Sequence, residues 1–245
     1  MQVSGSGVIP AGEYNEKISI SGSGRIQGNV RCTALAVAGS ATAQGSVWCE
    51  EDMKAAGSAR MEKSVCAKNI HVSGSCHVCE DCTAEGEIKA AGSLRCGGNI
   101  RCHTLRAAGT VHVAGGVEAE DVRISGGIDC AGLLNAERIE IKIERASSRV
   151  GSIGGSDIRI YSESIAGKIS RMPLLSKFVG RGVGGVDVAE SIEGDTIAIE
   201  RVSAPLVVGR IVAVGADCCI DLVQYSETVE IHPDAKVGRY EKIGE

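Results

Sequence analysis

The chain has very few aromatic side chains. Its 245 residues include one Phe, one Trp and four Tyr, although 43% of the residues are hydrophobic. Most of these hydrophobic residues are Val, Ile and Ala. Because small and β-branched side chains cannot fill a thick interior, the composition predicts a thin hydrophobic core.

Targeting segments are also missing from the sequence. The start, MQVSGSGVIPAGEYNEKI, has neither the positive charge nor the long apolar run of a signal peptide. No stretch approaches the ~18 apolar residues of a membrane-spanning helix. The eleven cysteines, an odd number, are therefore expected to be reduced thiols in the cytoplasm. The net charge of -5 gives no reason to expect nucleic acid as a partner.

A short unit repeats along the first 141 residues. The pair Ser-Gly or Ala-Gly recurs with its glycine at 5, 22, 39, 57, 74, 92, 109 and 126, so that the spacing is 17 or 18. The units are 4–20, 21–37, 38–55, 56–72, 73–90, 91–107, 108–124 and 125–141. Each unit contains three short stretches in which every second residue is apolar, the pattern of a strand with one buried face.

Three strands per unit, separated by Gly, Ser and Asn corners, predict an all-β fold. We expect a right-handed parallel β-helix with a triangular cross-section and 17–18 residues per turn. At ~4.8 Å per turn, eight turns make a rod about 38 Å long. The glycine at the second position of each unit, and often at the eighth, is expected to supply backbone freedom at two corners.

The first unit departs from the pattern. Its tenth and twelfth positions, which point inward in other units, hold Glu13 and Asn15. Unpaired strand edges at the end of such a coil can template another strand. The N-terminal end is therefore expected to be either an assembly face or an end that these polar residues protect.

The rhythm loosens after residue 141 and returns within 194–231, where TIAI, RIVAV and TVEI alternate again. We therefore divide the chain into a main β-helix (1–163), an inserted basic and apolar loop (164–190), and a second coil segment with a cap (191–245).

The inserted loop is the candidate contact site. Residues 165–186 contain four cations, no acid and the only Phe of the chain. The candidate residues are Lys168, Arg171, Leu174, Leu175, Lys177, Phe178 and Arg181. In one interpretation the apolar side of this loop folds back over the coil while its charges are solvated. In the other, the loop is a tether for an anionic membrane surface or a partner protein.

Three cysteines, Cys76, Cys79 and Cys82, have the spacing of a zinc or iron–sulfur site. The repeat, however, places Cys76 and Cys82 at inward positions, and only Cys79 at a corner. This favours core packing for these sulfurs, with a metal-binding module as the alternative. In Cys218–Cys219, alternation points one side chain inward and the other outward.

Two histidines, His77 and His112, fall at the same outward position of units two turns apart. They are therefore expected to be surface residues about 10 Å from each other.

The ~17-residue unit and the segments SGSGRIQGNV, AGSATAQGSV and GGIDCAGLLNAERIEI resemble the bactofilin family, which are polymer-forming bacterial cytoskeletal proteins. The resemblance extends over essentially the whole chain, with SIEGDTIAIE and the residues after it similar to the second coil segment of a longer form. The chain differs from a typical short member in its very short N-terminal segment and its inserted loop.

The resemblance implies nucleotide-independent assembly into filaments by end-to-end contact of β-helices, often at the inner membrane. It also implies that the protein scaffolds envelope, cell-shape or motility machinery. No catalytic residue and no cofactor are expected, so the chain is expected not to be an enzyme.

Two alternatives remain beside the metal-binding module. One is a β-helical adaptor that does not polymerise and binds a partner on its flat faces. The other is a hexapeptide-repeat acyltransferase, which the mixed 17 and 18 spacing disfavours because such enzymes need an apolar residue at every sixth position.

Overall fold

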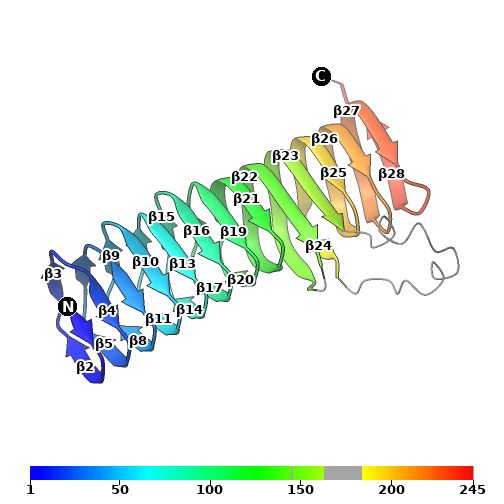
Figure 1. Ribbon diagram of the computed structural model, residues 1–245. Coiled ribbons are helices and arrows are strands. Elements are labelled where there is room, and N and C mark those ends of the chain that lie inside the picture. Colours follow the sequence, from blue (N-terminus) through cyan, green and yellow to red (C-terminus); the bar gives the residue numbers. More distant parts are fainter. Residues whose placement is uncertain (145, 163–183, 245) are drawn as a thin grey trace, which may run out of the picture.

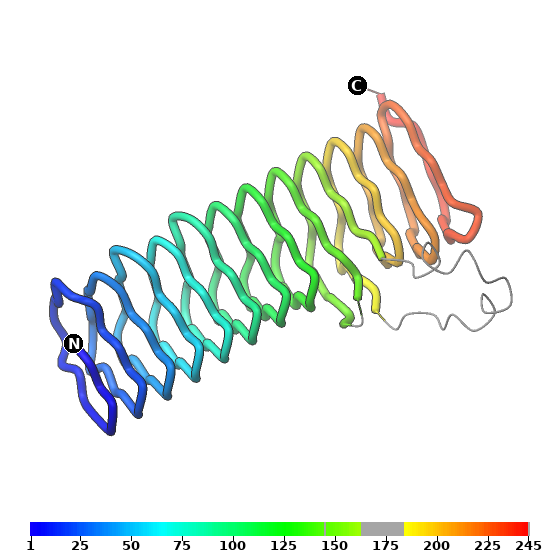
Figure 2. Tube along the Cα trace, viewed as in Figure 1, coloured from blue at the N-terminus to red at the C-terminus, as the bar shows by residue number. Residues whose placement is uncertain are grey.

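The structure, a computed structural model, describes residues 1–144, 146–162 and 184–244. These residues form a single β-solenoid of about 13 turns, in which the strands of neighbouring turns pair in parallel. Figures 1 and 2 show one continuous rod that runs from the N-terminal turn in blue to the C-terminal turn in red. The predicted all-β parallel β-helix is confirmed.

Each of the first six turns contains three strands, and the seventh begins with two more. These strands form three stacks along the rod that we call faces 1, 2 and 3. Face 1 contains β1 (Gln2–Val3), β4 (Ile18–Ile20), β7 (Leu35–Val37), β10 (Asp52–Ala55), β13 (Asn69–Val72), β16 (Glu87–Ala90) and β19 (Thr104–Ala107). Face 2 contains β2 (Ser6–Ile9), β5 (Ser23–Ile26), β8 (Ser40–Ala43), β11 (Ser58–Met61), β14 (Ser75–Val78), β17 (Ser93–Cys96) and β20 (Thr110–Val113). Face 3 contains β3 (Gly12–Tyr14), β6 (Val30–Cys32), β9 (Val47–Cys49), β12 (Val65–Ala67), β15 (Cys82–Ala84) and β18 (Ile100–Arg101).

The strands after β20, with the exception of β24, are longer, run around a corner and contribute to two or three faces. They are β21 (Val117–Ile124), β22 (Gly127–Ile143), β23 (Ser148–Ser162), β24 (Val186–Val188), β25 (Ser191–Ile199), β26 (Val202–Val214), β27 (Cys219–Ile231) and β28 (Lys236–Lys242). The turn length also varies more here than the predicted 17–18 residues. Ile141 pairs with Ile160, nineteen residues on, and Ile199 pairs with Val214, fifteen residues on.

The core follows from strict alternation. In β5, β11 and β20 the second and fourth residues are buried, and the first and third are exposed. Since the register is kept from turn to turn, inward residues stack in rows, such as Val37, Ala55 and Val72 on face 1. The buried side chains are chiefly Ile, Val, Leu, Ala and Cys. This is the thin core that the composition predicts.

The glycines at the corner between faces 1 and 2 are required by close packing. A Cβ atom added to Gly74 would lie 2.1 Å from the carbonyl oxygen of Gly57, one turn below. The same contact, at 1.9–2.1 Å, recurs at Gly22, Gly39, Gly57, Gly92, Gly109 and Gly126. None of these glycines has a positive φ, so the expected need for backbone freedom at this corner is wrong. At the next corner, between faces 2 and 3, Gly28 does require the backbone freedom of glycine, because its φ is 84°.

The first turn corrects a second expectation. Gly12 pairs with Val30 and Tyr14 with Cys32, so Gly12 and Tyr14 occupy the inward positions of β3. Glu13 and Asn15 are exposed, not inward. The corner between β2 and β3 is one residue shorter than the equivalent corner of the next turn, and this shifts the register by one residue.

The two coil segments form one rod. Residues 157–160 of β23 pair with 196–199 of β25 on face 1, and β24 pairs with 148–150 of β23 on face 2. The coil therefore leaves at Ser162 and resumes at Gly184, across the corner that glycine occupies in earlier turns. β24 lies within the range 164–190 that the sequence assigns to the loop.

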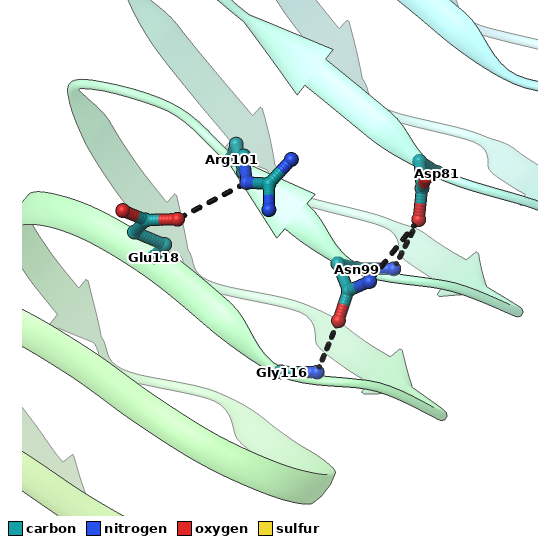
Figure 3. A network of polar contacts seen from close by, with 5 residues as sticks. All are labelled: Asp81, Asn99, Arg101, Gly116 and Glu118. Carbon is teal, nitrogen blue, oxygen red and sulfur yellow. Dashed lines mark hydrogen bonds and ion pairs between the residues drawn. The ribbon is translucent and has the colours of Figure 1, made fainter.

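Polar side chains bridge successive turns at the corner between faces 2 and 3 (Figure 3). The backbone N–H of Asn99 donates to Asp81 Oδ1 at 2.8 Å, and Asn99 Oδ1 accepts from the backbone N–H of Gly116 at 2.9 Å. Nearby, Arg101 Nε lies 3.0 Å from Glu118 Oε2. One asparagine thus connects three consecutive turns.

Replacing Gly74 with Ala should lower the free energy of unfolding by about 2–3 kcal/mol, because the new methyl group overlaps the Gly57 carbonyl oxygen. Gly5 occupies the same position in the first turn and has no atom within 4 Å of an added Cβ. Gly5→Ala should therefore change stability by less than about 0.5 kcal/mol. Urea unfolding followed by circular dichroism measures both, and equal losses would contradict the packing argument.

Replacing Asn99 with Ala should cost about 1 kcal/mol, since the Gly116 N–H then loses its side-chain acceptor. Asn135→Ala is the matched control, because Asn135 is exposed on face 3 and its side chain makes no hydrogen bond with the described residues. The same unfolding measurement applies, and an Asn135→Ala loss as large as that of Asn99→Ala would refute the bridging role.

Candidate functional site

The predicted contact loop lies outside the described residues. This applies to Lys168, Arg171, Leu174, Leu175, Lys177, Phe178 and Arg181. The structure does show where this segment joins the coil, between Ser162 and Gly184 at the corner of faces 1 and 2.

The three closely spaced cysteines are divided between core and corner. Cys76 on face 2 and Cys82 on face 3 are buried, which confirms their predicted core positions. Cys79 is half-buried at the corner between them, with its Sγ 4.0 Å from His77 Nε2. Across the part of the chain that the structure describes, no three His, Cys, Asp or Glu side chains are grouped to hold a metal ion.

Burial makes the thiols of Cys76 and Cys82 poor nucleophiles and poor metal ligands, because it raises the pKa of both. It raises the pKa of Cys76 to about 12, so the thiolate is scarce at neutral pH. Cys32 and Cys49 stack one turn apart with their Sγ atoms 3.7 Å from each other. The hydrogen bond between these two thiols, together with burial, raises the pKa of Cys49 well above its ordinary value. Cys218 is buried and Cys219 exposed, as alternation predicts.

The N-terminal end of the rod is partly covered. Strands β1, β2 and β3 each pair with one neighbour only, so one edge of each is open. Tyr14 packs against the core, and its hydroxyl donates to the carbonyl oxygen of Pro10 at 2.9 Å. The amino group of Met1 pairs with Glu16 at 2.8 Å. This end therefore presents a tyrosine side chain and a charged pair beside its open edges.

The C-terminal end instead presents the apolar cross-section of the core. Val223 is 0% exposed, whereas Tyr240, its partner in the last turn, is 58% exposed. Three more residues continue buried rows into the last turn and are only half-buried there: Val229, Ile231 and Val237. No further described turn covers them, and the outer edge of β28 has no paired strand among the described residues.

The sides of the rod carry two shallow hollows lined by cations. One, of about 290 Å³ on face 1, is lined by Lys89, Arg106, Arg123 and Lys142 together with Glu140 and Tyr161. The other, of about 660 Å³ on face 2, includes His77, Arg95, His112 and Arg149 together with Asp129. The register places Arg95 directly between the two histidines, which are two turns apart as predicted. His112 is exposed and His77 half-buried.

The electrostatics of the face 2 hollow favour a neutral imidazole at His77. Partial burial and the charges of Arg60 and Arg95 lower the pKa of His77 below its ordinary value. Arg60 Nη1 lies 3.0 Å from His77 Nδ1. The prediction for the two histidines rests on their own positions, and the further signal in the sequence is the row of arginines in the same outward register.

In the described ranges, no helix is long and apolar enough to span a bilayer. Comparison of the chain with models of known protein families, with curated proteins and with solved structures finds no match.

Proposed function

We propose that the chain is a structural protein whose rods assemble end to end into nucleotide-independent filaments. The observation that supports this best is the C-terminal turn, where Val229, Ile231, Val237 and Tyr240 continue the core rows and no further turn among the described residues covers them. Covering apolar side chains stabilises association. Open strand edges at both ends add backbone donors and acceptors that a further strand can pair with.

An end-to-end contact of this kind propagates. If the C-terminal end of one rod meets a different surface, the N-terminal end of the next, the contact is heterologous and does not close. The result is a filament whose growth needs no nucleotide. As in the bactofilin family, which the repeat resembles, such a filament would scaffold envelope, cell-shape or motility machinery in the cytoplasm or at the inner membrane.

An adaptor that stays monomeric is the second candidate. It is favoured by Tyr14 and the charged pair at Met1, which partly cover the N-terminal end. Electron microscopy separates the two, because an adaptor gives single short rods at every protein concentration.

Replacing Tyr240 with Lys should raise the protein concentration needed for filaments about tenfold or more, because a charge must then be buried at the end contact. Trp48→Lys is the matched control, since Trp48 on face 3 is 56% exposed and Tyr240 is 58% exposed. Sedimentation and negative-stain microscopy measure both variants. If Tyr240→Lys forms filaments like the unaltered protein, the C-terminal turn is not the contact.

The membrane contact that the loop composition predicts is tested separately. Replacing Leu175 and Phe178 with Glu should abolish co-sedimentation with anionic vesicles, because it removes apolar side chains and adds negative charge. Leu133→Glu, at a residue 47% exposed on the side of the rod, should leave co-sedimentation unchanged. Unchanged binding of the Leu175 and Phe178 variant would show that the loop is not the tether.

A further inference from the structure

Face 2 of the first seven turns has an unusually uniform outer surface. Its strands have the sequences SGVI, SGRI, SATA, SARM, SCHV, SLRC and TVHV, so that each begins with a hydroxyl residue and none contains Asp or Glu. The register aligns the hydroxyl residues in one row: Ser6, Ser23, Ser40, Ser58, Ser75, Ser93 and Thr110. A second outward row contains Val8, Arg25, Thr42, Arg60, His77, Arg95 and His112.

Four of the cations on the other two faces of these turns have acidic partners. On face 1, Lys54 pairs with Asp52 at 3.1 Å and Arg106 with Glu87 at 3.3 Å. On face 3, Arg31 pairs with Glu50 at 3.2 Å and Arg101 with Glu118 at 3.0 Å. Most of the positive charge on these faces is therefore neutralised locally.

The arginines of face 2 are different. Arg25 and Arg95 form no ion pair with any described residue, and the contact of Arg60 is with the imidazole of His77. The first acid in this row is Asp129, one turn after His112, which it approaches at 3.3 Å. Although the chain as a whole has a net charge of -5, this face keeps an uncompensated positive charge.

Both rows contribute to the hollow of about 660 Å³, where Ser93 and Thr110 lie beside Arg95 and His112, and where Asp129 of the following turn is also part of the lining. Guanidinium and hydroxyl groups are hydrogen-bond donors, and the planar arginine fork suits phosphate oxygens particularly well. Because the rows run parallel to the rod with one position per turn, an extended chain of anions lying along them meets several donors at once. This arrangement fits a linear polyanion better than a single small ion.

The residue types also indicate which polyanion. None of the seven strands contains Phe, Tyr or Trp. Proteins that bind single-stranded nucleic acid commonly stack its bases on aromatic side chains, and face 2 has no such platform. Inorganic polyphosphate has no bases to stack, so the guanidinium and hydroxyl donors of face 2 suffice to bind it.

We infer that face 2, from β2 to β20, binds a linear polyphosphate along the rod axis. Arg25, Arg60 and Arg95 pair with its phosphate oxygens, and the serine and threonine hydroxyls donate to neighbouring oxygens. The side of the rod does not take part in the end-to-end contact proposed above, so this binding does not depend on filament formation.

The test measures binding of fluorescently labelled polyphosphate to the full chain by anisotropy. Affinity should fall steeply between about 50 and 200 mM salt, as it does when several phosphate contacts release counterions. The double variant Arg60→Gln/Arg95→Gln should bind about tenfold or more weakly, because two charged hydrogen-bonding groups are lost.

Arg31→Gln/Arg101→Gln is the matched control. It makes the same change of charge at face 3 side chains that are 58% and 64% exposed, and binding should change less than about twofold. Both double variants should keep the thermal midpoint of the unaltered chain within a few degrees. Tyr240→Lys should bind polyphosphate normally even if it forms no filaments, which separates this test from that of the proposed function.

Three outcomes would overturn the inference. One is the absence of binding at low salt. Another is an equal loss in both double variants, which would mean that general charge and not face 2 attracts the polymer. The third is binding of polyglutamate or single-stranded DNA as tight as that of polyphosphate.

Discussion

The fixed distance between hydrogen-bonded parallel strands constrains the rest of this molecule. Every turn lies ~4.8 Å above the one before it, along the whole rod. At the corner of faces 1 and 2 that distance brings a carbonyl oxygen to the place of a Cβ atom, so only glycine fits at positions such as Gly57 and Gly74. It also stacks equivalent side chains in rows, inside and outside. The contact that a residue makes at one position of a turn is therefore repeated at the same position of the neighbouring turns.

This repetition explains why the fold could be predicted from sequence. Each inward position occurs in about eight units before residue 141, so alternation and the Gly spacing identify the coil although the residue at any one position varies. The core positions of Cys76 and Cys82 follow from the same pattern, as does the burial of one side chain, Cys218, in the pair Cys218–Cys219. The role of the corner glycines could not be predicted in this way, because a glycine selected by a close contact and one selected by a positive φ are identical in sequence. Likewise, the repeat predicts inward positions for Glu13 and Asn15, which are exposed. The corner before them is one residue shorter than in the next turn, and the spacing of the glycines does not reveal this.

The candidate surfaces were predictable to different degrees. The row of hydroxyl residues on face 2 is visible in the sequence as soon as the units are aligned. The anion-binding role inferred for this face cannot be read from the sequence, because it depends on which cations form ion pairs with acids. Those pairs join different turns, as Arg31 with Glu50 and Arg101 with Glu118 show. The exposed core at Val237 and Tyr240 also needs coordinates, since both residues continue rows that are fully buried one turn earlier. The ends and sides thus differ in chemistry: both ends have open backbone edges, the C-terminal end is apolar, and face 2 is polar and cationic.

The corner between Ser162 and Gly184 has a practical consequence. In the turns up to residue 127 two residues, such as Ser21 and Gly22, suffice at this place. Here residues 163–183 stand between Ser162 and Gly184, and the strands on either side still pair in register. Chain length at this corner is thus uncoupled from the geometry of the rod. A fluorescent protein or an affinity tag inserted there would label the rod in its C-terminal half, away from strands β2 to β20, which carry the hydroxyl row.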